Sequence, residues 1–192
     1  MRISTIFGAT LALSASFGGF TTSYLHALEL AQAKVSFVKP PNLLSATTTY
    51  NQTDVWGATY YFTIELPANA GRPLQQVTIK QVQGFDNIRF NSEETRAFEG
   101  KPRHKGEKLT LKEVTYDIKT NTISVIFDPP VSPGKTVTIA LHPVRNPDTG
   151  GAYLFGVTAF PLAENPYGLY LGVGSLEFYD HDSDFGLLRF HR

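Results

Sequence analysis

Three aspartates alternate near the end of the chain in the pattern that opens a calcium-binding loop. Asp180, Asp182 and Asp184 repeat the D-x-D-x-D spacing, in which alternate side chains converge on one cation. The rest of the consensus is absent, because Phe185 stands where the sharp-turn glycine belongs and His191 replaces the bidentate glutamate. The stretch therefore has two interpretations, an acidic solvated turn and a weak, partly hydrated calcium site, and the turn is the simpler one.

Two short motifs match catalytic signatures without the surroundings that catalysis needs. Ser132-Pro133-Gly134-Lys135 has the S-x-x-K spacing of serine acyl-enzymes, but Pro-Gly predicts a β-turn in place of the required helical turn. Asp148-Thr149-Gly150 is the aspartic-protease tripeptide, in which two such carboxylates share one proton. The preceding Arg145-Asn146-Pro147 is not the apolar strand that such an aspartate requires. Both motifs are therefore interpreted as turns.

The composition excludes several classes of chemistry and of partner. The 192 residues include no cysteine, so disulfides, thiol nucleophiles and iron–sulfur clusters are impossible. Lys plus Arg and Asp plus Glu number 17 each, and this balance provides no long-range field that would attract nucleic acid. A hydrolase with carboxylates assembled in space is the remaining enzymatic alternative, for which Glu65 and Glu177 are candidates on predicted strands.

One segment concentrates positive charge. Lys101, Arg103, His104, Lys105 and Lys108 follow one another within a few residues. Such a run is usually a solvated loop, and the alternative is a contact with anionic glycans or lipid headgroups.

From Val35 onward the apolar residues recur with a period of two, which predicts strands. In the clearest strand, Trp56 to Leu66, every second residue from Trp56 is apolar, so Trp56 is expected on the buried face. The run Leu109 to Ile118 slips by one residue, which predicts a β-bulge near Lys112-Glu113. A turn at 119–122 then returns the chain into a hairpin.

The later strands indicate a sandwich. Residues 152–160 are apolar on both faces, as in a central strand, while Gly172 and Gly174 within the strand 170–179 predict a bend or a close approach of another backbone. The one helical signal is at 92–98, where Ser92 can cap a turn or two. Seven to nine short strands separated by Pro/Gly turns predict an all-β fold, a single β-sandwich of the immunoglobulin-like or Greek-key type, with a barrel as the alternative.

The N-terminus has the features of a secretory signal. Met1-Arg2 supplies one positive charge and residues 3–20 are apolar without an ionisable group. Cleavage is expected after Ala33, which closes an A-x-A pattern, or after Ala27. We therefore predict a signal peptide at 1–33, a single domain at 34–192 and no permanent membrane span after cleavage. A mature chain of about 160 residues can bury roughly 70% of its unfolded surface without disulfides.

Three stretches carry a resemblance to a known family: Tyr61–Leu74, Val131–Thr138 and Asn146–Gly172. With the signal segment, the chain resembles a family of exported cyanobacterial proteins known only as a domain of unknown function. The resemblance implies a periplasmic or outer-envelope location and supplies no catalytic residues. The function expected is thus a non-enzymatic binding or structural role in the cell envelope, through loops or a strand edge, with an envelope protein or a glycan as partner.

Overall fold

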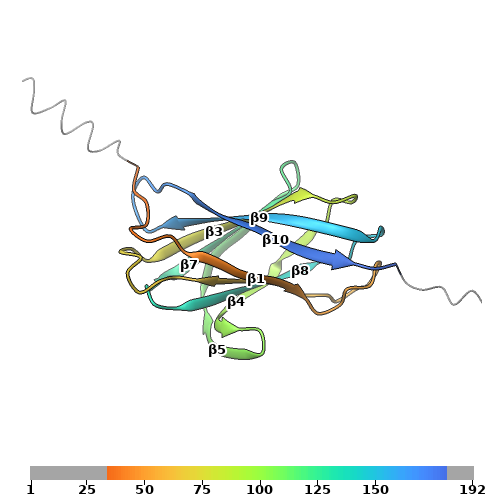
Figure 1. Cartoon of the computed structure of the whole chain (residues 1–192), viewed down its shortest axis with the longest axis horizontal. Helices are drawn as coiled ribbons and strands as arrows, with labels where there is room; N and C mark the ends of the chain where they lie inside the picture. Colours follow the sequence, from red (N-terminus) through yellow and green to blue (C-terminus); the bar gives the residue numbers. More distant parts are fainter. Residues whose placement is uncertain (1–33, 181–192) are drawn as a thin grey trace, which may run out of the picture. The chain divides into compact units, whose positions relative to one another are not determined.

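The computed structural model describes residues 34–180, which form ten strands and no helix (Figure 1). The strands fall into two antiparallel five-stranded sheets, which we call sheet 1 and sheet 2. Sheet 1 has the order β1-β2-β8-β4-β5 and sheet 2 the order β10-β9-β3-β7-β6. The strands of sheet 1 are β1 (Asn42–Thr48), β2 (Tyr60–Glu65), β8 (Thr136–Pro143), β4 (Phe90–Lys101) and β5 (His104–Leu109). Those of sheet 2 are β10 (Leu169–Phe178), β9 (Gly151–Pro161), β3 (Leu74–Gln83), β7 (Thr122–Val131) and β6 (Leu111–Asp117). The predicted all-β sandwich is confirmed, with ten strands where the sequence predicted seven to nine.

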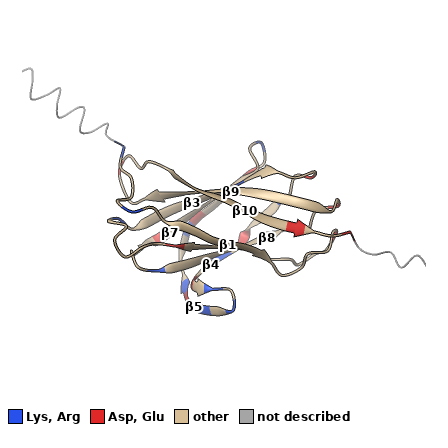
Figure 2. Cartoon of the chain, viewed as in Figure 1, with Lys and Arg blue, Asp and Glu red and all other residues tan. Residues whose placement is uncertain are grey.

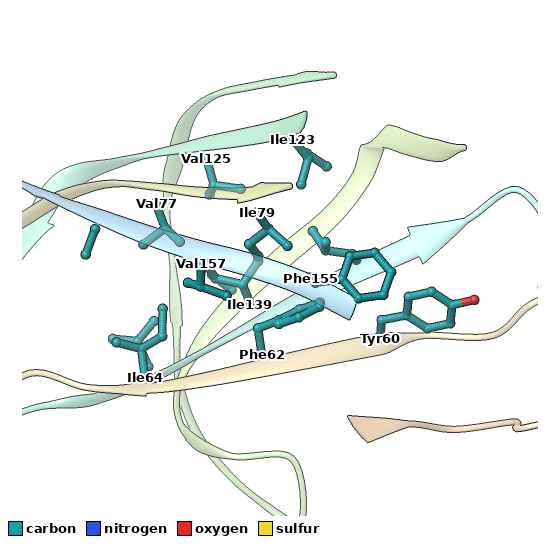
Figure 3. Packing of buried hydrophobic residues seen from close by; sticks show 14 of the residues in the cluster. Tyr60, Phe62, Ile64, Val77, Ile79, Ile123, Val125, Ile139, Phe155 and Val157 are labelled. Carbon is teal, nitrogen blue, oxygen red and sulfur yellow. The ribbon is translucent and has the colours of Figure 1, made fainter. Parts of the chain in front are cut away.

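The two sheets enclose one aromatic core. Tyr60, Phe62 and Ile64 of β2 point to the interior and are fully buried, as their alternation predicted. They meet Phe155 and Val157 of β9 across the sandwich (Figure 3). The rings of Phe62 and Phe155 lie 5.6 Å apart at 72°, the edge-to-face arrangement that aromatic pairs prefer. Alternation along both strands therefore positions the two sheets face to face.

The irregularities predicted within strands are present. Leu111 pairs with Phe127 and Glu113 with Ile126, so the extra residue of the bulge is Lys112. In β10 the register shifts between Tyr170 and Gly172, where Gly172 has a φ of 113°.

Gly174 allows the two sheets to approach each other at one side of the sandwich. A Cβ at this position would lie 2.6 Å from the Cβ of Ala46 on β1. Gly172 thus marks a register shift in β10, and Gly174 allows side chains of sheet 1 to come close to the backbone of β10.

The helical signal at 92–98 was misleading. These residues belong to β4, in which residues 92–95 bulge out between the pairs Asn91–His142 and Arg96–Ala140. The Arg96 guanidinium donates to the carbonyls of Glu93 and Thr95 and so supports the bulge. One or two helical turns are marginal in water, whereas in β4 the segment pairs with β8 and buries Ala97.

The expected burial of Trp56 was also wrong. The predicted strand begins at Tyr60, four residues later than the alternation suggested, and the Trp56 side chain is 68% exposed. Gly57 follows it with a φ of 76°, a conformation that takes the chain out of the extended region. The predicted signal peptide at 1–33 lies outside the described residues and stays a prediction.

Candidate functional site

Four connections gather at one end of the sandwich, because antiparallel pairing returns the chain there repeatedly. They are the β1–β2, β3–β4, β6–β7 and β8–β9 connections, residues 49–59, 84–89, 118–121 and 144–150. We call this end, with Tyr179 and Asp180 after β10, the loop end.

A cleft of about 260 Å³ opens between three of these connections. Trp56 comes from the β1–β2 connection, Asp86 and Arg89 from β3–β4, and Arg145 and Asp148 from β8–β9. The cleft thus combines an exposed indole with two cations and two carboxylates. Its remaining lining residues are Asn87, Ile88, Val144, Asn146 and Pro147.

Asn146 joins two of the connections from beneath the cleft. Its side chain is 1% exposed, accepts a hydrogen bond from the Tyr60 hydroxyl (2.8 Å), and donates to the carbonyls of Tyr50 (3.1 Å) and Gln52 (2.8 Å). Its backbone N–H donates to the carbonyl of Val55 (2.9 Å). A buried amide with all these partners fixes the β1–β2 connection against β8–β9.

The segment that carries Trp56 is held on both sides. The Thr53 N–H donates to the carbonyl of Tyr179 and the Asp54 N–H to that of Pro147. Asp54 and Gly57, which flank the tryptophan, both have positive φ, 62° and 76°. No atom lies within 4 Å of where a Cβ of Gly57 would be, so the glycine serves the backbone conformation and not the packing.

Asp86 fixes the β3–β4 connection in the same way. Its carboxylate accepts hydrogen bonds from the Thr149 N–H (2.9 Å) and the Tyr153 hydroxyl (3.1 Å). Burial works to raise the pKa of Asp86, but these hydrogen bonds outweigh it and hold the pKa below its ordinary value. Burial, with Asp86 beside it, raises the pKa of Tyr153 to about 12. Asp86 is therefore an ionised structural anchor.

Arg145 presents its guanidinium between two carboxylates. One terminal nitrogen donates to the Asp54 carboxylate. The other donates to the Asp148 carboxylate at a distance of 2.7 Å. The two acids come from different connections, so the arginine has one defined orientation at the mouth of the cleft. Its side chain is 38% exposed, which leaves donor capacity facing solvent.

The structure places the sequence motifs as follows. Asp148-Thr149-Gly150 is in the β8–β9 connection, with Asp148 paired to Arg145, and is a turn as interpreted. Ser132–Lys135 is the turn between β7 and β8, where Gly134 has a φ of 88° and Lys135 pairs with Glu99. Neither motif has catalytic geometry.

Of the three candidate calcium ligands, only Asp180 can be placed. Its carboxylate accepts a hydrogen bond from the Gly150 N–H at 3.0 Å, which ties the end of β10 to the β8–β9 connection. Asp182 and Asp184 lie outside the described residues, so the calcium site stays a prediction. Between residues 34 and 180, no group of three or more His, Asp or Glu side chains is arranged to hold a metal ion.

The two glutamates considered for a hydrolase lie on different surfaces. Glu65 follows buried Ile64 on β2 and faces outward from sheet 1, where the Asn42 amide contacts it. Glu177 alternates with buried Leu176 and Phe178 and faces outward from sheet 2. They do not face a common cleft.

The basic segment forms a hairpin of β4 and β5 at the edge of sheet 1 (Figure 2). Lys105 lies over the rings of Phe98 and Tyr61, with its Nζ 5.2 and 5.8 Å from their centroids. Charged residues on an edge strand also discourage pairing with another chain.

The sequence interpretation missed the cleft itself. Trp56 was assigned to the core, and Arg145 and Asn146 were considered only as parts of a turn. The signal that was present is Asp54 and Gly57 around the tryptophan, two residue types that tolerate positive φ and end a strand. Within residues 34–180 no helix is long and apolar enough to cross a membrane.

Fold and cleft together define a β-sandwich domain with a preorganised loop end. A family model described as a protein of unknown function, DUF2808, matches residues 34–178. The chain belongs to this family. Comparison with curated proteins gives no match.

Several solved structures share the sandwich. A collagen-binding domain from a Staphylococcus aureus adhesin is 14% identical with a TM-score of 0.37, covering 69% of this chain and 95% of that one. The C-terminal domain of the Streptococcus agalactiae AgI/II polypeptide BspA is 15% identical (TM-score 0.39), covering 66% of this chain and 45% of that one. The collagen-binding subdomain of the Enterococcus faecalis surface protein ACE is 8% identical (TM-score 0.37), covering 76% and 98%. Similarity at this level concerns the fold alone.

Proposed function

We propose that the chain is a non-catalytic binding module of the cell envelope, exported by a cyanobacterium, and that it holds its partner at the loop-end cleft. The partner is an envelope protein or a glycan. One observation carries the proposal: buried hydrogen bonds fix the backbone segment that presents an exposed tryptophan. Asn146 is fully satisfied beneath the cleft, while Trp56 above it is 68% exposed.

An exposed aromatic side chain on a fixed backbone segment is suited to binding. Tryptophan, tyrosine and arginine are the residues that contribute most to the energy of protein contacts, and the aromatic ones present a large rigid surface with few rotamers to lose. A site that is already ordered spends less free energy on association than a mobile one. Trp56 and Arg145 meet both conditions in the same cleft.

The carboxylates of the cleft favour binding over hydrolysis. General acid catalysis needs a carboxyl group whose pKa is raised towards the working pH. Asp86 has a lowered pKa and accepts two hydrogen bonds, and Asp148 is paired with Arg145. Asp86 thus serves to hold two connections together, and Asp148 serves to orient Arg145.

The proposed location rests on the sequence. The apolar segment at 3–20 and the A-x-A pattern ending at Ala33 support export to the periplasm or outer envelope. A stable core without cysteine also suits an exported domain that folds without disulfide formation.

Retention on envelope material tests the proposal. Trp56→Ala should reduce retention of the purified chain on an isolated envelope fraction at least tenfold. The matched control is Tyr167→Ala, an exposed aromatic at the opposite end of the sandwich, which should bind as the unmodified chain does. Equal retention of both variants would remove the cleft as the binding site.

A further inference from the structure

We infer that the ligand of the loop-end cleft is an uncharged carbohydrate, with Trp56 as the surface on which a sugar ring stacks. This assignment rests on the proposed function of the cleft and adds the chemical class of the ligand. Four properties of the cleft support it: an exposed indole, paired planar polar groups, balanced charge and small size.

Trp56 offers the apolar part of such a site. A pyranose ring has one face made mainly of C–H groups, and a flat indole can cover that face without displacing its hydroxyl groups. The Trp56 side chain is 68% exposed and its segment is fixed by the Asp54–Pro147 and Thr53–Tyr179 backbone hydrogen bonds. The indole is therefore the aromatic ring among the residues that line the cleft.

The polar groups suit hydroxyl groups. A hydroxyl both donates and accepts, so adjacent sugar hydroxyls are satisfied best by donors and acceptors side by side. Arg145 and Asp148 provide this arrangement, since the guanidinium lies 2.7 Å from the carboxylate and the Asp148 side chain is 61% exposed. Both groups are planar and held by each other, which gives the directionality that sugar recognition needs.

The charge of the cleft is balanced. Among the lining residues Arg89 and Arg145 are offset by Asp86 and Asp148, and Asp54 at the mouth also pairs with Arg145, so a polyanion gains little there. The concentrated positive charge of the domain lies instead on the β4–β5 hairpin, where Lys101, Arg103 and Lys105 are exposed (Figure 2). An uncharged, hydroxyl-rich ligand fits the cleft better than an ionic one.

The size of the cleft favours a sugar over a protein. Its volume of about 260 Å³ is just below the roughly 300–1,000 Å³ of pockets that enclose drug-sized ligands. A stable protein contact instead covers about 800 Å² on each partner. A glycan chain can seat one part of itself in the cleft and extend from the cleft into solvent.

Selective destruction of the two partner classes tests the inference. Periodate cleaves vicinal diols of sugars, and protease removes envelope proteins. Retention of the chain on the envelope fraction should survive protease treatment and fall at least tenfold after periodate. Raising the sodium chloride concentration to about 0.5 M should change it less than twofold, because an uncharged ligand makes no ion pairs to be screened.

The single tryptophan gives a second, direct readout. Trp56 is the only tryptophan of the chain, so its fluorescence reports on the cleft alone. Polysaccharide purified from the envelope should quench or shift this emission saturably, and Arg145→Ala should weaken the effect at least tenfold while Tyr167→Ala leaves it unchanged. Heparin serves as the polyanionic control and should leave the emission as it is.

The outcomes separate this inference from the proposed function. Retention that depends on Trp56 but is lost with protease and not with periodate would overturn the carbohydrate assignment and leave the binding module standing. A response to heparin alone would also overturn it. Retention that is independent of Trp56 would overturn both.

Discussion

Replacing Asn146 by alanine removes the buried link beneath the cleft. The side chain makes three hydrogen bonds, to the Tyr60 hydroxyl and to the carbonyls of Tyr50 and Gln52. Each is worth about 1 kcal/mol net, and the penalty rises when partners stay buried without a replacement. The Tyr60 hydroxyl is such a partner, since Tyr60 is 0% exposed. We therefore expect Asn146→Ala to lower the free energy of unfolding by about 3–5 kcal/mol.

Thermal and guanidinium unfolding measure this loss. For a domain of this size about 3–5 kcal/mol corresponds to a fall in Tm of roughly 10–15 °C. Asn69→Ala is the control, because Asn69 is exposed at the opposite end of the sandwich, and its change should stay within about 0.5 kcal/mol. In a double-mutant cycle, Tyr60→Phe with Asn146→Ala should cost at least about 1 kcal/mol less than the two single changes added. A loss below about 1 kcal/mol for Asn146→Ala would refute the structural role assigned to the amide.

Further predictions concern the core, the tyrosines and the candidate metal site. The Thr95 hydroxyl is buried and has no hydrogen-bond partner within the described part of the chain, so Thr95→Val should be neutral or stabilising in chemical unfolding. Thr138→Val is the comparison, because it removes the hydrogen bonds of the Thr138 hydroxyl with Thr63 and with the carbonyl of Gly100. It should lower the free energy of unfolding by about 1–3 kcal/mol. Gly174→Ala should destabilise by about 1–3 kcal/mol, since its Cβ would meet that of Ala46 at 2.6 Å; a Tm equal to that of the unmodified chain would contradict the close approach. Because the pKa of Tyr153 is raised in the folded state to about 12 from an ordinary 10.0, its contribution to stability is complete below pH 10 and declines as the pH rises towards 12. A pH series of unfolding curves should show this decline, and Tyr153→Phe should reduce it. If Asp180, Asp182 and Asp184 bind calcium, millimolar calcium should raise Tm and EDTA should reverse the rise; an unchanged Tm would dismiss that site.

The sequence predicted the fold well where burial alternates. Tyr60, Phe62 and Ile64 were assigned correctly because each second residue of a strand faces the core. The bulge at Lys112 was also predictable, since a one-residue slip in the apolar pattern has one simple structural cause. The segment 92–98 was mistaken because a local capping signal says nothing about the strand β8 that lies beside it.

The cleft was less predictable because its residues are distant in sequence. Asn146 contacts Tyr60, Tyr50 and Gln52 across more than eighty residues, and only the strand order brings them together. The alternation of apolar residues also extends beyond the N-terminal end of β2, which begins only at Tyr60. Trp56 was placed in the core for this reason. Asp54 and Gly57, on either side of the tryptophan, have positive φ. The period of two in the apolar residues does not reveal this backbone conformation.

The quenching of Trp56 fluorescence by acrylamide, with and without the isolated envelope fraction and with the emission of that fraction alone subtracted, tests the central claim most directly. Since Trp56 is the only tryptophan and is 68% exposed, the free chain should be quenched strongly. Occupation of the loop-end cleft should reduce the quenching constant at least twofold, and Tyr167→Ala should behave identically. An unchanged quenching constant for chain that is demonstrably bound to the envelope would show that the partner is held elsewhere and would contradict the account.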